Sequence, residues 1–311
     1  MLNKFSFTKS AKYFIAGSIT VIILGVIFAV IHGGLNFGID FTGGTLMTIN
    51  MGGEFNDQDV KDVLVKLGVN DAPVVKSGQN GAQDQAIIRM KDSGDEEQER
   101  QIRINIVSGL KEKYSSAYEL SFQRVGAVSS SELIKNAIIA VLIASVGILI
   151  YVWIRFELIS GIAAIVALLH DVLIMLAFCA IINLPINSSF IAAVLTIVGY
   201  SINDTIVVFD RIRENDKIYT RKEKSQGDVV DISVKETLTR TLYTSLTTLL
   251  TITVLYILGV QTIKEFALPI IVGLVSGTYS SIFIASPIWV LWEDSRGKKD
   301  KSKKGNKPSV A

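Results

Sequence analysis

Long uninterrupted apolar runs dominate the chain. A helix needs about 20 mostly apolar residues, within a range of about 17 to 25, to cross a hydrocarbon core about 30 Å thick. Six runs meet this requirement: Tyr13–Ile31, Ala137–Ile154, Leu158–Ile182, Phe190–Phe209, Leu242–Leu258 and Phe266–Trp292. The pattern therefore predicts a polytopic α-helical membrane protein with six transmembrane helices.

The first run follows three lysines, Lys4, Lys9 and Lys12, as the apolar part of a signal peptide would. Its apolar stretch is longer than the roughly 7–15 residues of such a peptide, and no small-x-small cleavage site follows it. We therefore expect Tyr13–Ile31 to stay in the protein as the first transmembrane helix.

The stretch between the first two runs has the composition of a soluble domain. Residues 32–135 hold 11 Lys/Arg and 15 Asp/Glu, an ordinary density for a globular fold. Apolar alternation and helical periodicity predict a strand over Thr45–Asn50, a helix capped by Asn56, a hairpin of Val74–Ser77 with Ala86–Met90, a helix over Asp95–Tyr114 and a strand around Leu120–Gln123. The order βαββαβ predicts a ferredoxin-like α+β domain outside the membrane, with both helices on one face of the sheet.

Nothing in the chain has the pattern of a catalytic or metal site. Cys179 is the only cysteine, and His32 and His170 are the only histidines, which excludes an intramolecular disulfide and a His/Cys metal site. The sequences GxxxxGKS/T, HExxH and GxSxG are absent as well. We therefore expect no enzyme activity, no cofactor, no metal and no nucleic-acid partner, and we interpret the outer domain as a binding or coupling module.

Basic residues set the predicted orientation. The N-terminal segment, the loop after the second run, residues 210–241 and the tail 293–311 together hold 19 Lys/Arg, whereas the loops 183–189 and 259–265 hold only Lys264. Because short cytoplasmic loops carry the excess of Lys and Arg, both termini are expected in the cytoplasm. The predicted regions are 1–31 (first helix), 32–135 (outer domain), 136–292 (five helices) and 293–311, a basic tail that anionic membrane lipid would attract.

Two ionisable residues near the cytoplasmic ends of the spans are functional candidates, because charges inside a membrane are costly. Counted from the outer end of its run, Asp204 lies about 20 Å deep, and Arg240 lies about 7 Å further in. Asp204 can accept a proton with an affinity set by the distance to Arg240, since burial favours the neutral carboxyl and a nearby cation favours the carboxylate. The alternative is a fixed ion pair that locks two helices.

Other polar groups lie within the predicted spans. His170 and Asp171 stand midway along the third run, and Asn203 precedes Asp204. These residues form either a secondary proton path or a packing contact in which they hydrogen-bond a neighbouring helix. The hydroxyl residues between Thr237 and Thr253 either line a hydrated path or, as we favour, pack helices closely.

Two stretches resemble signatures of the SecD/SecF family. The first, NFGIDFTGGT, is similar to the family's GxDFxGG signature through Gly38, Asp40, Gly43 and Gly44. The second, VGYSINDTIVVFDRIREN at Val198–Asn215, looks like a fourth-span signature of the same family. The sequences around Asp171 and Arg240 fit the pattern too, so the resemblance runs in order along nearly the whole chain.

This resemblance implies a function. Members of the family assist the SecYEG channel in the late translocation of preproteins across the bacterial cytoplasmic membrane, at the expense of the proton gradient. The resemblance assigns the proton path to Asp204 and Arg240. It also implies a SecD-like six-span partner subunit, because six spans make only half of such a transporter.

Three other functions are alternatives to this one. The first is half of a related proton-driven exporter of lipids or small molecules. The second is a plain scaffold in which Asp204 has a structural role. An intramembrane aspartyl protease, the third, is disfavoured because that family carries GxGD, whereas Ser201-Ile202-Asn203 precede Asp204 here.

Overall fold

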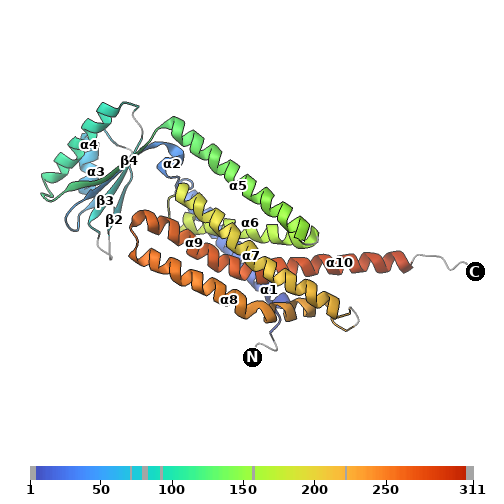
Figure 1. The fold of residues 1–311 in the computed structure, drawn as a ribbon. Helices are drawn as coiled ribbons and strands as arrows, with labels where there is room; N and C mark the ends of the chain where they lie inside the picture. The colour runs from blue at the N-terminus through green and yellow to red at the C-terminus, as the bar shows by residue number, and fades with distance from the viewer. Residues whose placement is uncertain are drawn as a thin grey trace, which may run out of the picture.

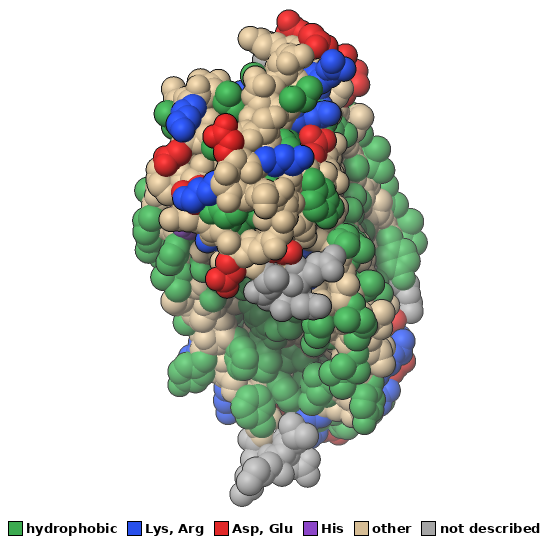
Figure 2. Space-filling model, turned by 90° about the vertical axis from the view of Figure 1, so that its left-hand side faces the viewer, with side chains coloured by type: hydrophobic (Ala, Val, Ile, Leu, Met, Phe, Trp, Pro, Cys, Tyr) green, Lys and Arg blue, Asp and Glu red, His purple; other side chains and the backbone are tan. Residues whose placement is uncertain are grey.

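The computed structural model describes residues 5–70, 72–78, 83–91, 94–155, 158–220 and 223–305. Within these ranges, six helices are long and apolar enough to cross a membrane, which confirms the predicted number of spans. They form an elongated bundle, and a small sheet with two helices lies at one end of it (Figure 1). Charged side chains gather on the sheet domain, whereas hydrophobic side chains cover the flanks of the bundle (Figure 2).

Several helices extend beyond the apolar runs. The bundle consists of α1 (Phe7–Ile31), α5 (Ala127–Arg155), α6 (Leu158–Ile181), α7 (Ser188–Ile218), α8 (Gln226–Leu258) and α9 (Gln261–Ser280), and α9 continues through the π-helical turn η2 (Ser281–Ala285) into α10 (Ser286–Gly305). The polar extensions of α7 and α8 bond to each other: Arg211 Nε donates to Glu236 at 2.7 Å, and Asn215 Nδ2 donates to Ser233 at 3.0 Å. The expected ends of these two runs therefore mark a change from apolar to polar side chains within continuous helices.

Helices α7 and α9 approach each other closely at two glycines. A Cβ atom at Gly273 would lie 2.5 Å from Ile197, and one at Gly277 would lie 3.1 Å from Ser201. Small residues at such positions allow helix backbones to pack closely in membranes. Helix α5, by contrast, exposes most of its apolar side chains, among them Ile143.

The last span changes its helical form near the middle. At Ser281–Ala285 the chain forms a π-helical turn, and Ser286 Oγ donates to the carbonyl of Ser281 at 2.8 Å. Ile282 and Ala285 of this turn are buried with Trp289, which follows it, in one apolar cluster. Such single turns are rare and occur often at functional sites.

The outer domain has the expected sequence of strands and helices, preceded by one short additional helix. Its elements are α2 (Ile39–Thr42), β1 (Gly44–Asn50), α3 (Asp57–Lys66), β2 (Val74–Ser77), β3 (Gln85–Met90), α4 (Glu96–Lys111) and β4 (Tyr118–Val125). The strands are antiparallel in the order β2-β3-β1-β4. Asn56 caps α3 as predicted, accepting from the backbone N–H of Gln58 at 3.1 Å. The hairpin turn is expected at Gly78–Gly81; its residues after Gly78, and the tail beyond residue 305, lie outside the described residues.

One face of this sheet carries the core of the domain. Met47, Ile49 and Ile88 alternate with more accessible residues along β1 and β3 and are fully buried. They pack against apolar residues of both helices, namely Val60, Leu64, Ile106 and Leu110. Alternation in the strands and helical periodicity in α3 and α4 thus produce a single two-layer core.

Replacing Ile88 by Ala is expected to destabilise the outer domain by about 2–5 kcal/mol, because it removes buried methyl groups and leaves a cavity. Hydrogen exchange of the amides of β1 and β3 in the full-length protein measures the loss. Val75→Ala is the matched control, since Val75 is 55% exposed on β2 and such surface changes stay within about 0.5 kcal/mol. Equal exchange in both variants would contradict this assignment of the core.

Candidate functional site

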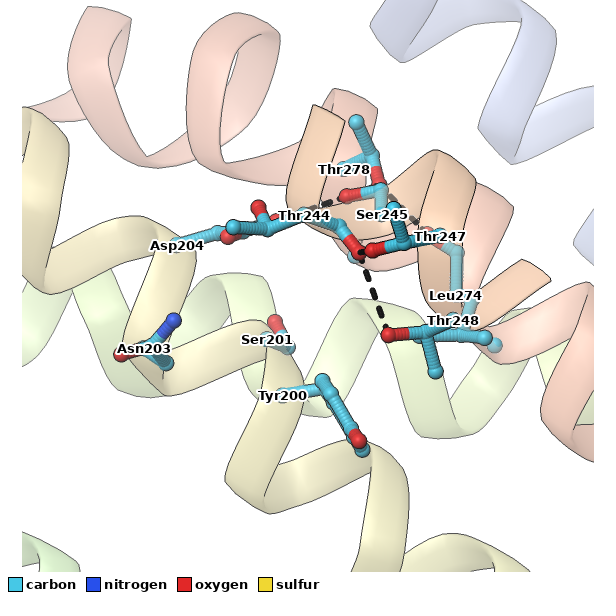
Figure 3. A pocket seen from close by; sticks show the side chains of 12 residues that line it. Tyr200, Ser201, Asn203, Asp204, Thr244, Ser245, Thr247, Thr248, Leu274 and Thr278 are labelled. Carbon is cyan, nitrogen blue, oxygen red and sulfur yellow. Dashed lines mark hydrogen bonds between the residues drawn. The ribbon is translucent and has the colours of Figure 1, made fainter. Parts of the chain in front are cut away.

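Asp204 lies at a point where three helices of the bundle meet. It belongs to α7, its side chain is buried with 8% exposure, and its Oδ2 atom accepts a hydrogen bond from Ser245 Oγ of α8 at 3.2 Å. Ser245 in turn accepts from Thr278 Oγ1 of α9 at 2.8 Å. Figure 3 shows these side chains pointing toward one another between the helices. The sequence predicted that Asp204 lies deep within a transmembrane helix, but it identified neither hydroxyl partner.

A cavity of about 230 Å³ adjoins this carboxylate. Most of the residues that line it carry a hydroxyl or another polar group, although their apolar atoms contribute most of the exposed lining; they are Tyr200, Ser201, Asn203, Asp204, Thr244, Ser245, Thr247, Thr248, Gly273, Leu274, Gly277 and Thr278. A cavity of this size bordered by hydroxyl groups has room for several water molecules. The arrangement can therefore bring water to a carboxylate within a transmembrane helix.

The hydroxyl residues of α8 have two roles. Thr244, Thr247 and Thr248 line the cavity, and each donates to a backbone carbonyl of its own helix. Ser245 instead bonds across to α7. The favoured expectation of close packing therefore describes only part of this face, since several of its hydroxyls border the cavity.

Arg240 lies on α8 with an exposed side chain. Among the described residues, no salt bridge joins it to Asp204, although its charge still acts on that carboxylate from a distance. The hydrogen bond that reaches Asp204 from α8 comes from Ser245. Ser245 follows Arg240 by five residues, which is about 7 Å along the helix axis. A fixed Asp204–Arg240 ion pair, the alternative interpretation of the sequence, is therefore not the arrangement in the part of the chain that the structure describes.

Asp171 is the centre of a second, buried polar network. It is 1% exposed on α6, and four donors surround its two carboxylate oxygens. Ser276 Oγ donates to Oδ1 at 2.7 Å, and His170 Nδ1 lies 3.0 Å from the same oxygen. Ser201 and Ser280 donate to Oδ2 at 2.6 and 2.9 Å. The donors come from α6, α7 and α9, so the carboxylate bonds three helices together.

His170 continues this network toward α1. Its Nε2 atom lies 2.9 Å from the hydroxyl of Tyr279, which lies 2.7 Å from Ser18 Oγ. Ser201 connects the network to the cavity, because it donates to Asp171 and also lines the cavity beside Asp204. Asn203 lines the same cavity and is exposed.

The predicted glycine motif lies elsewhere, at the junction of the bundle and the outer domain. Gly38 precedes α2, Asp40 belongs to it, and Gly43 and Gly44 connect it to β1. Gly44 has φ +121°, and a Cβ atom there would collide with the carbonyl oxygen of Met90. The structure therefore separates this motif from the cavity at Asp204.

Family models match the chain in two places. The model described as "Protein export membrane protein SecD/SecF, C-terminal" matches residues 106–295, and the "SecD/SecF GG Motif" model matches residues 28–51. The chain belongs to the SecD/SecF family. The first match contains Asp171, Asp204 and Arg240, whereas the second contains the glycine motif.

Individual members of the SecD/SecF family align over most of the chain. The protein translocase subunit SecF of Sebaldella termitidis is 39% identical, with 91% of this chain and 93% of that protein covered. The protein translocase subunit SecDF of Bacillus subtilis is 38% identical over 96% of this chain, which spans 39% of that longer protein. The crystal structure of SecDF, a translocon-associated membrane protein from Thermus thermophilus, matches with a TM-score of 0.82 at 35% identity, covering 93% of this chain and 39% of that one.

The sequence did not predict the serine donors around Asp171, although it left a signal for them. Ser276 and Ser280 are four residues apart, so they lie on one face of a helix. Alone, that spacing predicts only a small-residue packing face. The acceptor that gives these serines their role lies more than 100 residues away in the chain.

Proposed function

We propose that the chain is a SecF-like subunit of an accessory complex of the Sec translocase, and that it couples the proton gradient to late preprotein translocation through Asp204. The observation that carries the proposal is a buried carboxylate beside a cavity within the bundle that is bordered by hydroxyl-bearing residues. Family membership supports the translocase role and favours it over an exporter of lipids or small molecules.

The chemistry proposed for Asp204 is reversible protonation. The neutral carboxyl suits a buried position, whereas the carboxylate needs water or a cation nearby. Ser245 accepts from Thr278 and donates to Asp204, so it orients the carboxylate without supplying charge. Arg240 is the proposed source of that charge: movement of its guanidinium toward Asp204 would favour proton release, and movement away would favour proton uptake.

The proposed roles of the other polar residues follow from their contacts. Four donors from three helices support a packing role for Asp171, with His170 as one of those donors. Asn203, which is exposed beside the cavity, is proposed to hold water at its entrance.

The proposed complex has further members. A SecD-like six-span subunit would complete the transporter, and the exposed apolar faces of α5 and α8 support such a covering partner or lipid. The SecYEG channel and the translocating preprotein are the other proposed partners. The distribution of basic residues supports a bacterial cytoplasmic membrane location with both termini, including the basic tail, on the cytoplasmic side.

The test compares export with and without the chain. Inner membrane vesicles are prepared from bacterial cells depleted of the chain and from cells in which it is restored, and completion of preprotein translocation is followed with a proton gradient imposed or collapsed. We expect the gradient to accelerate completion severalfold only when the chain is present. An equal response to the gradient in depleted vesicles would overturn the proposal.

A further inference from the structure

The segment after α1 is bonded to the loop that begins α7. The backbone N–H of Ile186 donates to the carbonyl of Asn36 at 2.7 Å, and the N–H of Gly38 donates to the carbonyl of Ile186 at 2.7 Å. Two residues further on, a carboxylate oxygen of Asp40 accepts from the backbone N–H of Ser188 at 2.8 Å. Ser188 is the first residue of α7, so the glycine-motif segment holds the outer end of the helix that carries Asp204.

The first glycine of the motif is required by this contact. A Cβ atom at Gly38 would lie 2.9 Å from Cβ of Asn187 and 3.3 Å from the carbonyl oxygen of Ile186. Real Cβ atoms rarely approach that closely, so any other residue would push the two segments apart. The close approach also keeps Asp40 near the N–H of Ser188, where its negative charge faces the positive end of the α7 dipole.

A side chain of the outer domain reaches into the same contact. Arg89 of β3 donates from Nη1 to Oδ1 of Asn36 at 2.8 Å and to the carbonyl of Phe37 at 3.3 Å. The amide nitrogen of Asn36 then donates to the carbonyl of Asn183 at 2.9 Å. Asn36 therefore bridges the sheet of the outer domain and the loop between α6 and α7. Partial burial lowers the pKa of Arg89, and the carboxylate of Glu265 partly offsets this effect.

Helix α9 is tied to the junction as well. Asn187 Nδ2 donates to Glu265 of α9 at 2.8 Å, and Ser77 of β2 lies 3.4 Å from Gln261 of α9 in a longer hydrogen bond. The outer domain thus meets α7 and α9 at their first turns. The same two helices line the cavity with Asp204 and Thr278.

We propose that Asn36, Asp40 and Arg89 form a joint that fixes the orientation of the outer domain to the outer ends of α7 and α9, and that they are positioning residues for coupling. The joint rests on the proposed function in one respect only, the link to proton binding at Asp204. From Ser188 to Asp204 a helix of this length spans about 24 Å, and a packed helix moves as a rigid element. A shift of α7 near Asp204 therefore reaches the outer domain through Asp40 and Asn36.

The covalent connections do not fix this orientation by themselves. The segment between α1 and α2 contains Gly33 and Gly34, both at positive φ, and α5, which follows β4, exposes its apolar side chains along its length. The noncovalent contacts of the joint are the additional constraint. Without them the outer domain is expected to sample a wider range of orientations.

The orientation is tested by distance measurements between spin labels in the full-length protein. Labels are placed at E112C on the outer domain and L258C at the outer end of α8, both exposed positions, in a C179A background. The joint variants R89M and D40A are expected to broaden or shift the distance distribution. D40N, which keeps an acceptor oxygen for the N–H of Ser188, is expected to stay close to the unsubstituted protein.

The matched control is K113M. Lys113 forms a 2.6 Å ion pair with Asp59 within the outer domain, so the variant removes a cation from the same domain without touching the joint. We expect its distance distribution to be unchanged. Distributions for R89M and D40A that match those of K113M and the unsubstituted protein would overturn the joint.

Coupling is tested separately by gradient-stimulated export in the same variants, after each is shown to assemble with the SecD-like subunit. We expect R89M and D40A to lose most of the gradient-dependent acceleration, with D40N and K113M retaining it. Altered distances with unchanged acceleration would overturn the positioning role. If D204N also keeps the acceleration, the proposed function fails, whereas the distance measurements still decide whether the joint exists.

Discussion

Replacement of Asp204 by Asn is expected to abolish the gradient-dependent part of preprotein export while leaving the protein folded. Asn has nearly the same shape, and its side-chain oxygen can still accept the hydrogen bond from Ser245. It cannot bind and release a proton at physiological pH. The variant therefore keeps the packing of the three helices and removes only the titratable group beside the cavity. The measurement is the rate of translocation with an imposed and a collapsed proton gradient.

The control for this variant removes a carboxylate from the same helix outside the apolar region. Glu214 lies in the polar extension of α7, where it pairs with Arg211 at the surface. We expect Glu214→Gln to retain the response to the gradient, because exposed ion pairs contribute little. A response retained by Asp204→Asn as well would assign Asp204 a structural role and would place the energy coupling elsewhere.

Replacement of Asp171 by Leu is expected to destabilise the bundle by about 3–5 kcal/mol, because several buried donors lose their acceptor at about 1–3 kcal/mol each. Three serine hydroxyls and one imidazole converge on this carboxylate. Without this acceptor, the buried donors lose a partner, and each donor left unsatisfied is costly. Ser280 retains a second acceptor, the carbonyl of Gly277 at 3.2 Å. Thermal unfolding and protease resistance of the purified protein in detergent measure the effect.

An exposed residue of the same helix, two positions before Asp171, provides the control. Leu169 is 60% exposed on α6, so Leu169→Ala is expected to leave the unfolding temperature nearly unchanged. Asp171→Asn separates the two interpretations of the network, because it preserves shape and removes the charge. A variant that is as stable as the unsubstituted protein but has lost gradient-dependent export would favour the secondary proton path over packing.

The sequence predicted the number of spans and the elements of the outer domain, because both depend on local patterns. The ends of α7 and α8 were predicted poorly. The last turns of α7 and the first turns of α8 are polar, and their helical form depends on contacts such as Arg211 with Glu236, which hydropathy does not detect. Hydropathy identifies only the apolar part of a helix. The helix continues beyond that part where tertiary contacts stabilise it.

The functional residues divide in the same way. The depth of Asp204 could be counted along a single run, so it was found from the sequence. Its partner Ser245 could not be distinguished from the neighbouring threonines, because only the rotation of α8 against α7 decides which hydroxyl faces the carboxylate. Arg89 was missed for a related reason: its partner Asn36 lies 53 residues earlier in the chain, and no local pattern connects them.

The π-helical turn in the last span has a consequence for how one helix serves two neighbours. An α-helix rotates by about 100° per residue, so one extra residue in a turn changes the direction in which every later side chain points. Before Ser281–Ala285, α9 presents Ser276 and Ser280 to Asp171; after it, the same span buries Trp289 in an apolar cluster. Deletion of a single residue from this turn would bring the two halves into one continuous phase and would rotate Trp289 away from that cluster. The π-helical turn thus rotates the side chains that follow it. The same helix can therefore contact the polar network of Asp171 on one side and the apolar cluster of Trp289 on another.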